Sequence, residues 1–534
     1  MQSYTLYTTS EFLRDRHPYI PDPNPRPLMD PEQVSVAYNE RAIPKLADLL
    51  VYPPLSSQKR RDSLHTLNEL VSHQETKVDM INNEIVLKAT NLMKDENPEV
   101  RFESAFLVGS LLFLKEGRLQ FDSNPENYEI MQKLIFDDEI KVRESVGWLL
   151  YRLSLHQKGI EMMNESKSIY KMVDAFNTYC LPEKIEENIF YLLYLLEGLI
   201  NCTRYDVNIK HTLNKGLLKS FNDILFDEDK KFSQNISRGL YTQLRELILS
   251  TCKNITLIFE GKNEAYDENL IITCNKFLDS PLEKERLYTS SMFMSVSNIL
   301  YAKKQICSYI NQELYLKFKK LDDAIRKGEF LDDEDEEERL RKERKELKEK
   351  PQHYQILEKI CALLKDPNYD IKQNSILCLQ NLSGLPEGFI KIIDILHEEL
   401  ELMNEVFGVD ALKGLTELLP KLSKYKNPPH IEMEMLPKYQ NVIKAIIYFY
   451  KKYNDDALSI LIHDTVNINQ KLGPFYILND PTLHKWAKYL TERINKKSPE
   501  NQEILSQFLE KYGNKNTNVS REFGDSLQLS DIMQ

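Results

Sequence analysis

Two short stretches decide how this chain folds: residues 95–101 read DENPEVR, and residues 137–143 read DDEIKVR. Each has a polar, acidic turn, then an aliphatic residue and a basic one, and each leads into an amphipathic segment. The aliphatic residues, Val100 and Val142, are 42 residues apart. A third copy, DPNYDIK, occupies 366–372. A period of about 40–47 residues is typical of armadillo and HEAT repeats.

The segments that follow these turns predict helices with one apolar face. Ala105, Val108 and Leu111 share a stripe at helical spacing, and Val146, Leu150 and Leu153 share another. Shorter helices are expected before the turns, at 85–93, 128–136 and 355–365, and less regular units at 42–72, 168–202, 214–258 and 269–301. A helix pair of this size cannot bury its apolar face alone. The sequence therefore predicts an all-α, armadillo/HEAT-like, right-handed superhelical solenoid.

Composition agrees with this fold and excludes several function classes. The chain has 534 residues but only 16 glycines, which disfavours sandwiches, barrels and propellers with frequent Gly-rich turns. The net charge of −12 argues against nucleic acid as the main ligand, because phosphate neutralisation needs a basic surface. The longest apolar run, 189–196, is far shorter than the roughly 20 residues of a membrane span. The seven cysteines, without any C-x-x-C pair, are expected to be reduced and buried.

The motifs of common catalytic and cofactor sites do not occur. The sequence has no H-E-x-x-H, no G-x-x-x-x-G-K-[ST], no G-x-G-x-x-G and no G-x-S-x-G. We therefore expect a non-enzymatic protein with no cofactor, no metal and no small-molecule substrate.

The chain divides into five parts. Residues 1–40, rich in proline, are expected to form an extended arm, and 513–534 a flexible tail. Repeats are expected over 41–320 and again over 353–512, with helices near 389–405, 409–424, 438–453, 455–471, 483–495 and 499–512. Between them, 321–352 is a charged insertion, acidic first and basic last, which favours a solvated helix over a disordered segment.

One polar side chain recurs at the same offset, ten residues after the aliphatic anchor. These positions are Ser110, Arg152 and Asn381, and Asn298 has a similar local context. Asparagines on the groove of such solenoids can hold the backbone of an extended peptide. For Asn298 and Asn381, a structural hydrogen bond is the favoured interpretation and ligand contact the alternative. Trp148 is expected to pack in the core, and the chain has only two tryptophans, which argues against a tryptophan-lined peptide groove.

Residues 30–46, DPEQVSVAYNERAIPKL, resemble the opening of the radial spoke head 14 homologue family, armadillo-repeat proteins of ciliary radial spokes. The likeness continues as a pattern over roughly 18–300, through VLKATNLMKDENPEVR at 86–101. It implies a non-enzymatic structural scaffold in the axoneme of motile cilia or flagella, with other radial spoke proteins as partners. Tyr19, Tyr38 and Arg41 then become candidate protein-binding residues of a docking arm. The charged insertion and the length of the chain depart from the family pattern.

Two other function classes remain open at this stage. A soluble adaptor for transport or signalling would bind extended peptides reversibly, and would lose its ligand when Asn298 and Asn381 are both replaced. An enzyme, or an exchange factor built on an armadillo scaffold, would depend on an active site that no motif in this sequence names.

Overall fold

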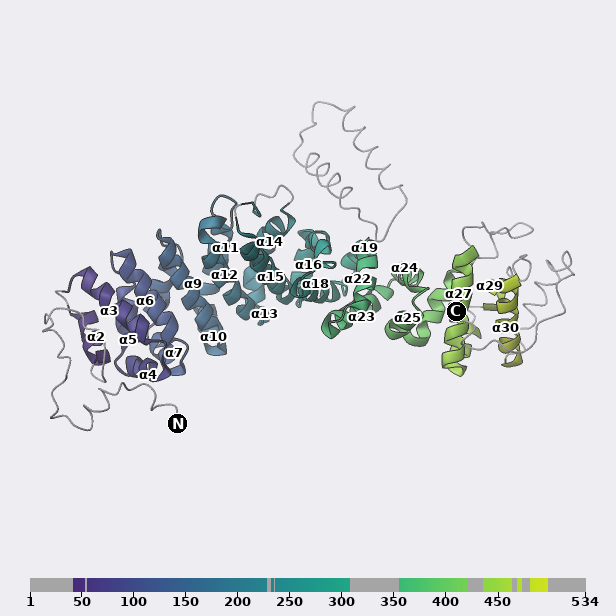
Figure 1. Cartoon of the computed structure of the whole chain (residues 1–534), viewed down its shortest axis with the longest axis horizontal. Helices are drawn as coiled ribbons and strands as arrows, with labels where there is room; N and C mark the ends of the chain where they lie inside the picture. The colour runs from purple at the N-terminus through teal and green to yellow at the C-terminus, as the bar shows by residue number, and fades with distance from the viewer. Residues whose placement is uncertain are drawn as a thin grey trace, which may run out of the picture. The chain divides into compact units, whose positions relative to one another are not determined.

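The computed structural model describes residues 42–52, 55–227, 232–234, 236–307, 355–419, 436–462, 468–472 and 481–497. All regular elements within these ranges are helices, in order along the chain from purple to yellow in Figure 1. The chain divides into two compact units, residues 1–202 and residues 203–534. The predicted arm (1–40), the charged insertion (321–352), the tail (513–534) and the helix near 499–512 lie outside the described residues.

The first unit consists of short helices and long ones that alternate in a regular order. Its helices are α2 (Ala42–Val51), α3 (Ser57–Leu70), α4 (Gln74–Asn82), α5 (Ile85–Leu92), α6 (Pro98–Leu111), α7 (Lys115–Asp122), α8 (Glu126–Leu134), α9 (Ile140–Ser154), α10 (Gln157–Glu165), α11 (Ser168–Tyr179) and α12 (Ile185–Cys202). The long helices α3, α6, α9 and α12 pack side by side in that order.

The second unit continues the same order and then becomes less regular. Its helices are α13 (Asp206–Leu213), α14 (Leu217–Phe226), α15 (Arg238–Ile255), α16 (Phe259–Asp267), α17 (Leu270–Cys274), α18 (Glu283–Val296), α19 (Leu300–Cys307), α22 (Gln355–Ala362), α23 (Tyr369–Ser383), α24 (Pro386–Leu396), α25 (Leu400–Phe407), α26 (Ala411–Glu417), α27 (Leu436–Tyr453), α28 (Asp455–Ile462), α29 (Ile468–Leu472) and α30 (Pro481–Lys497). Short 3₁₀ turns follow α17, α22 and α25. Here the long helices α15, α18 and α23 are neighbours.

Helix-start chemistry places the long helices where the sequence predicts them. Asn97 caps α6 by accepting a hydrogen bond from the Glu99 backbone N–H at 2.9 Å, and Pro98 occupies the first turn. Asn368 caps α23 in the same way. The anchors Val100, Val142 and Ile371 have no solvent exposure, which confirms their predicted place in the core.

The acidic turn and the basic residue of the repeated phrase are joined by hydrogen bonds. Arg101 Nη1 donates to the carbonyls of Asp95 and Glu96 in its own turn, at 3.0 and 2.9 Å. Its Nε and Nη2 donate to both carboxylate oxygens of Asp137, in the next turn of the same kind, at 2.8 and 2.9 Å. In the second unit Arg286 bonds its own Ser280 carbonyl and reaches Asp366. At both places the arginine joins one repeat to the following one.

The structure differs from the sequence prediction in the number of helices per repeat. A pair was expected, but a third, short helix lies between each long helix and the next pair: α4, α7, α10, α13, α16 and α19. In α7, Gly117 permits this turn, since a Cβ there would lie 2.3 Å from the Leu111 carbonyl oxygen. The predicted helix over 389–405 is two helices, α24 and α25, with the chain turning at 397–399.

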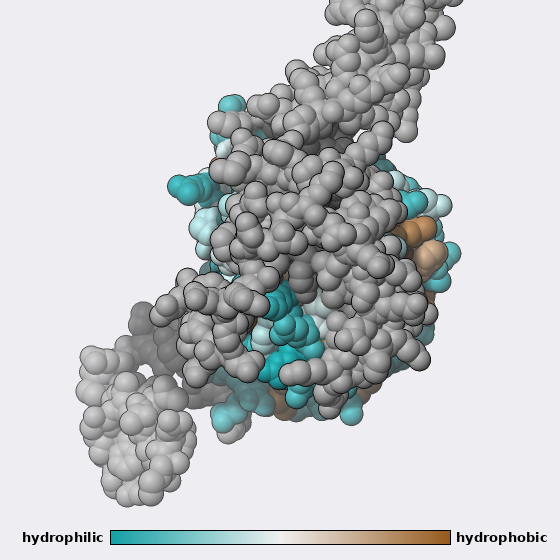
Figure 2. Space-filling model, turned by 90° about the vertical axis from the view of Figure 1, so that its right-hand side faces the viewer, coloured by the Kyte–Doolittle hydropathy of each residue, from teal (hydrophilic) through white to brown (hydrophobic). Residues whose placement is uncertain are grey.

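Side-chain burial follows the amphipathic pattern. The hydrophilic surface prevails among the coloured residues visible in Figure 2, with smaller hydrophobic areas at its edge. All seven cysteines are free and buried, as the sequence predicts. No helix in the described ranges is long and apolar enough to cross a lipid bilayer.

Candidate binding face on the long helices of the first unit

An aromatic strip crosses three adjacent long helices of the first unit. We use this name for Phe102 and Phe106 on α6, Trp148 and Tyr151 on α9, and Tyr194 on α12, all of them partly exposed. Residues three or four apart on a helix lie on the same side, so the pairs 102/106 and 148/151 share one face of their helices. Because α6, α9 and α12 pack side by side, their aromatic rings meet across the helix boundaries.

Trp148 is the centre of the strip. Its indole stacks on the Phe106 ring with 6.1 Å between centroids and 15° between planes. On the other side, the Tyr194 ring meets it edge-on at 5.7 Å. Gly109 brings α6 close enough for this contact, since a Cβ at that position would lie 2.9 Å from Trp148 Cδ1. Each such pair contributes about 0.5–1.5 kcal/mol beyond its buried area, so the strip is a rigid surface.

Arg152 covers the indole from one helical turn further along α9. Its guanidinium carbon lies 3.9 Å from the centroid of Trp148 and 5.6 Å from that of Phe113. It makes no hydrogen bond or ion pair with a described residue, and its Nε is buried without a partner. Burial lowers the pKa of Arg152, and nearby Tyr151, Tyr194 and Glu197 partly oppose that shift.

Two half-buried carboxylates lie beside the strip without a partner among the described residues. Burial raises the pKa of Glu144, on α9, and the neighbouring Arg143 and Lys141 offset only part of the shift. Burial likewise raises the pKa of Glu197, on α12, against the weaker influence of Arg152. Burial makes the charged form of an unpaired carboxylate less stable, and a cationic side chain placed beside it would stabilise that form.

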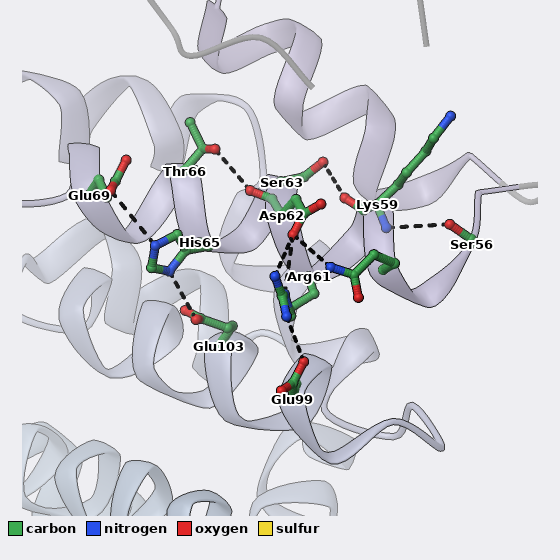
Figure 3. Close-up of polar contacts among 11 residues, drawn as sticks. Ser56, Lys59, Arg61, Asp62, Ser63, His65, Thr66, Glu69, Glu99 and Glu103 are labelled. Atoms are coloured by element: carbon green, nitrogen blue, oxygen red, sulfur yellow. Dashed lines mark hydrogen bonds and ion pairs between the residues drawn. The ribbon is translucent and has the colours of Figure 1, made fainter. Parts of the chain in front are cut away.

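The face becomes polar toward α3, as Figure 3 shows. In Figure 3, His65 Nδ1 lies 3.1 Å from Glu103 Oε1. Asn68 Nδ2 donates to the other oxygen of Glu103 at 2.6 Å. Arg61 Nη1 pairs with Glu99 at 2.8 Å. Carboxylates at this end are therefore engaged within the protein, whereas Glu144 and Glu197 beside the aromatic strip are not.

Two donors of this face have no hydrogen-bond partner among the described residues, the indole Nε1–H of Trp148 and the Nε–H of Arg152. Both atoms are buried, so a segment bound on the surface would not reach them. Its apolar side chains would cover the exposed parts of the rings, and a basic side chain would pair with Glu144 or Glu197. Trp148 packs against Phe106, Tyr194 and Arg152, as core packing requires, and part of its side chain stays exposed. A role of Trp148 in binding stays a prediction.

The recurring polar position links repeats to one another. Asn381 Nδ2 donates to Ser297 Oγ at 3.0 Å and to the Met294 carbonyl at 3.2 Å, both on the α18 side. This bond agrees with the structural interpretation, and ligand contact by Asn381 stays a prediction. The first unit has the same link from Asn201 to Ser154 Oγ at 3.1 Å, which the sequence analysis missed.

The other predicted site residues have different surroundings. Asn298 lies beyond the end of α18, is exposed, and bonds only the Ser295 carbonyl of its own helix. The link to the preceding repeat comes instead from Ser295, which donates to the Thr256 carbonyl. Ligand contact by Asn298 stays a prediction. Ser110 is partly exposed, one turn after Phe106, on the face that also holds Arg152. Tyr19, Tyr38 and Arg41 lie outside the described residues. Within the described ranges no cluster of His, Cys, Asp and Glu could hold a metal.

Comparisons with known proteins bear on the fold. The sequence matches no protein-family model and no curated protein. An engineered protein is similar in structure with a TM-score of 0.51 and 13% identity, over 86% of this chain and 99% of that one. A chain from a study of the interaction between cadherin and beta-catenin has a TM-score of 0.46 and 11% identity, over 85% and 94%. A designed armadillo repeat protein has a TM-score of 0.41 and 14% identity, over 48% and 99%. The chain is an all-α, armadillo/HEAT-like solenoid.

Proposed function

We propose that this protein is a non-enzymatic scaffold that holds partner proteins, and that the aromatic strip of its first unit is a binding face. The observation that carries the proposal is the row of partly exposed aromatic rings in mutual contact, beside the carboxylates Glu144 and Glu197, which have no ion-pair partner among the described residues. Aromatic surface of this kind is rarely left open to solvent without a ligand. A partner segment with apolar and basic side chains explains both the rings and the carboxylates.

The geometry favours a protein segment over a small molecule. The strip extends across α6, α9 and α12, so its ligand has to be several residues long. Its rings are partly exposed on a helical face, whereas sites for small molecules bury most of the ligand in a concave cavity. Aromatic and arginine side chains are also the residues that contribute most to protein interfaces.

Quantitative purification of a tagged chain tests this face. The variant Trp148→Leu with Glu197→Gln removes the indole and one carboxylate, and Trp486→Phe, on α30 in the second unit, is the matched control. We expect a partner at near one-to-one stoichiometry with the wild type and the control, and at least a tenfold loss with the double variant. Equal recovery by all three chains, with circular dichroism unchanged, would refute the assignment.

The finer proposal is that the assembly is the radial spoke of the ciliary axoneme. It is supported by the resemblance of residues 30–46 and of the pattern over roughly 18–300 to the radial spoke head 14 homologue family. Radial spoke and axonemal proteins are then the partners, and Tyr19, Tyr38 and Arg41 belong to the part of the chain that would dock.

Fractionation of detergent-stripped cilia distinguishes this assembly from the alternative. Retention of the tagged chain on axonemes after a salt wash, together with radial spoke subunits near one-to-one, is the expected result. Release into the soluble fraction with transport or signalling proteins would contradict it, and would favour the alternative function, a soluble adaptor that binds extended peptides reversibly.

A further inference from the structure

The second unit has an exposed apolar surface that the aromatic strip does not include. It lies on the turns before α13, α16 and α19 and on the first residues of those helices. We call this surface the turn ridge. Its residues are Tyr205, Val207, Leu257, Phe259, Leu300 and Tyr301, each between 39% and 66% exposed. Contiguous exposed apolar residues of this size mark interaction sites more often than chance surface.

Hydrogen bonds and one ring contact join the three turns to their neighbours. Asn254 Nδ2 donates to Thr203 Oγ1 at 3.3 Å, which joins the end of α15 to the turn before α13. Ser295 Oγ, near the end of α18, donates to the Thr256 carbonyl in the turn before α16. The rings of Tyr266, on α16, and Tyr301, on α19, lie 5.9 Å apart. The three turns that carry the ridge therefore lie on successive, packed repeats.

A row of lysines accompanies the ridge. Val207-x-x-Lys210, Phe259-x-x-Lys262 and Tyr301-x-x-Lys304 repeat one spacing, so each lysine lies a helical turn beyond an exposed apolar side chain. Lys210 pairs with Glu260 at 2.8 Å, and both side chains are about half exposed. Lys262 and Lys304 have no ion-pair partner among the described residues, nor does Arg204, which precedes Tyr205.

The carboxylates on these turns do not neutralise this row. Asp206 and Glu260 lie on the first turns of α13 and α16, and Glu260 is engaged by Lys210. Glu264 and Asp267 also lie on α16, but at about 100° per residue they are on a different side of that helix from Lys262. The charges without an ion-pair partner beside the ridge are thus those of Arg204, Lys262 and Lys304, in a chain whose net charge is −12. An acidic partner complements the ridge, and its attraction would be weakened by salt.

Repeat spacing indicates the conformation of that partner. Packed helices lie about 8–10 Å apart, so apolar groups on successive turns recur at about that distance. Residues seven apart on an α-helix share a face and are separated by about 10.5 Å. An extended strand alternates its faces, so residues three apart, about 10 Å, point in opposite directions. An apolar ridge also offers few hydrogen-bond donors or acceptors to the backbone of an extended peptide, whereas the backbone groups of a helix bond to one another.

We propose that the turn ridge binds an acidic amphipathic helix of a partner protein, with its apolar face on Val207, Phe259 and Tyr301 and its carboxylates near Lys262 and Lys304. This interaction lies in the second unit and does not depend on occupation of the aromatic strip. The helix would lie across the first turns of α13, α16 and α19.

Fluorescence anisotropy with two synthetic peptides tests the proposal on the full chain. Both have about 20 residues with leucine on one face at heptad spacing, and their remaining positions are glutamate in one and lysine in the other. We expect the glutamate peptide to bind with a Kd below about 100 μM and the lysine peptide at least tenfold more weakly. The variant Phe259→Ser with Tyr301→Ser should weaken binding of the glutamate peptide at least tenfold.

The matched control is Val78→Ser with Leu119→Ser, two exposed apolar residues on the short helices α4 and α7 of the first unit. It should bind the glutamate peptide like the wild type. The proposal is overturned if neither peptide binds, if the two peptides bind equally, or if the control loses as much affinity as the ridge variant. It is overturned in favour of a second copy of this chain if the ridge variant abolishes self-association in sedimentation velocity and leaves peptide binding unchanged.

Discussion

Replacing Arg143 with alanine is expected to destabilise the first unit by about 2–4 kcal/mol. This arginine is only 5% exposed, yet no carboxylate of a described residue forms an ion pair with it. Its Nη1 donates to the carbonyls of Asp137 and Asp138 at 2.5 and 2.9 Å. Its Nε and Nη2 donate to Asn188 Oδ1 on α12, at 3.1 and 2.6 Å. The guanidinium carbon also lies 4.6 Å from the centre of the Tyr179 ring.

The magnitude follows from these contacts. Hydrogen bonds to a charged group contribute about 1.5–3 kcal/mol each, and Arg143 makes four. Burying a guanidinium without a counter-ion has a desolvation cost, which offsets a large part of their sum. Alanine removes the desolvation cost but leaves the Asn188 oxygen and two carbonyls without donors, at about 1–3 kcal/mol for each group that water cannot reach. A net loss of about 3 kcal/mol remains.

Urea denaturation of the full chain, followed by tryptophan emission, measures this loss. In a Trp486→Phe background Trp148 is the sole tryptophan and reports on the first unit. The matched control is Arg61→Ala, whose side chain is 35% exposed and pairs with Glu99, which is 59% exposed. Exposed pairs contribute about 0–1 kcal/mol. The reasoning is refuted if the two variants lower the free energy of unfolding equally, or if Arg143→Ala lowers it by less than about 1 kcal/mol.

Three further outcomes are expected. Asn381→Leu should lower the stability of the second unit by about 1–2 kcal/mol, because Ser297 and the Met294 carbonyl lose their donor; hydrogen exchange at α18 and α23 measures it. The pKa of Glu264 is raised from 4.5 to about 7 by burial, then by its acidic neighbours, so the folded form binds the extra proton between those values. Acidification from pH 7 toward 4.5 therefore favours folding through this group, and Glu264→Gln should reduce the gain in thermal midpoint over that range; an unchanged pH profile would contradict the assignment. A thiol reagent should modify less than one cysteine per native chain and all seven in urea. Burial raises the pKa of Cys307 to about 11 but that of Cys202 and Cys274 to about 12, so Cys307 should react before those two.

The binding face is where sequence reasoning reached its limit. The offset analysis found Arg152 and Ser110, and helical spacing places Phe102 with Phe106 on one side of α6. Spacing along one helix could not pair α9 with α12, because contact between Trp148 and Tyr194 depends on how far apart neighbouring helices pack. The sequence also did not show whether Asn298 or Ser295 contacts the preceding repeat. The two lie three residues apart in the sequence, and packing brings only Ser295 within hydrogen-bond distance of that repeat.

The sequence alone determined the repeating units and their turns. Caps, anchors and the acidic-to-basic phrase act over a few residues, so Asn97, Val100 and Arg101 specify their roles locally. Only the tertiary structure decided which side chains lie together: the Arg101–Asp137 link between repeats, the short third helices, the boundary after Cys202, the aromatic strip and the turn ridge. These depend on the distance and rotation between successive repeats, which packing of whole helices sets and no single segment encodes.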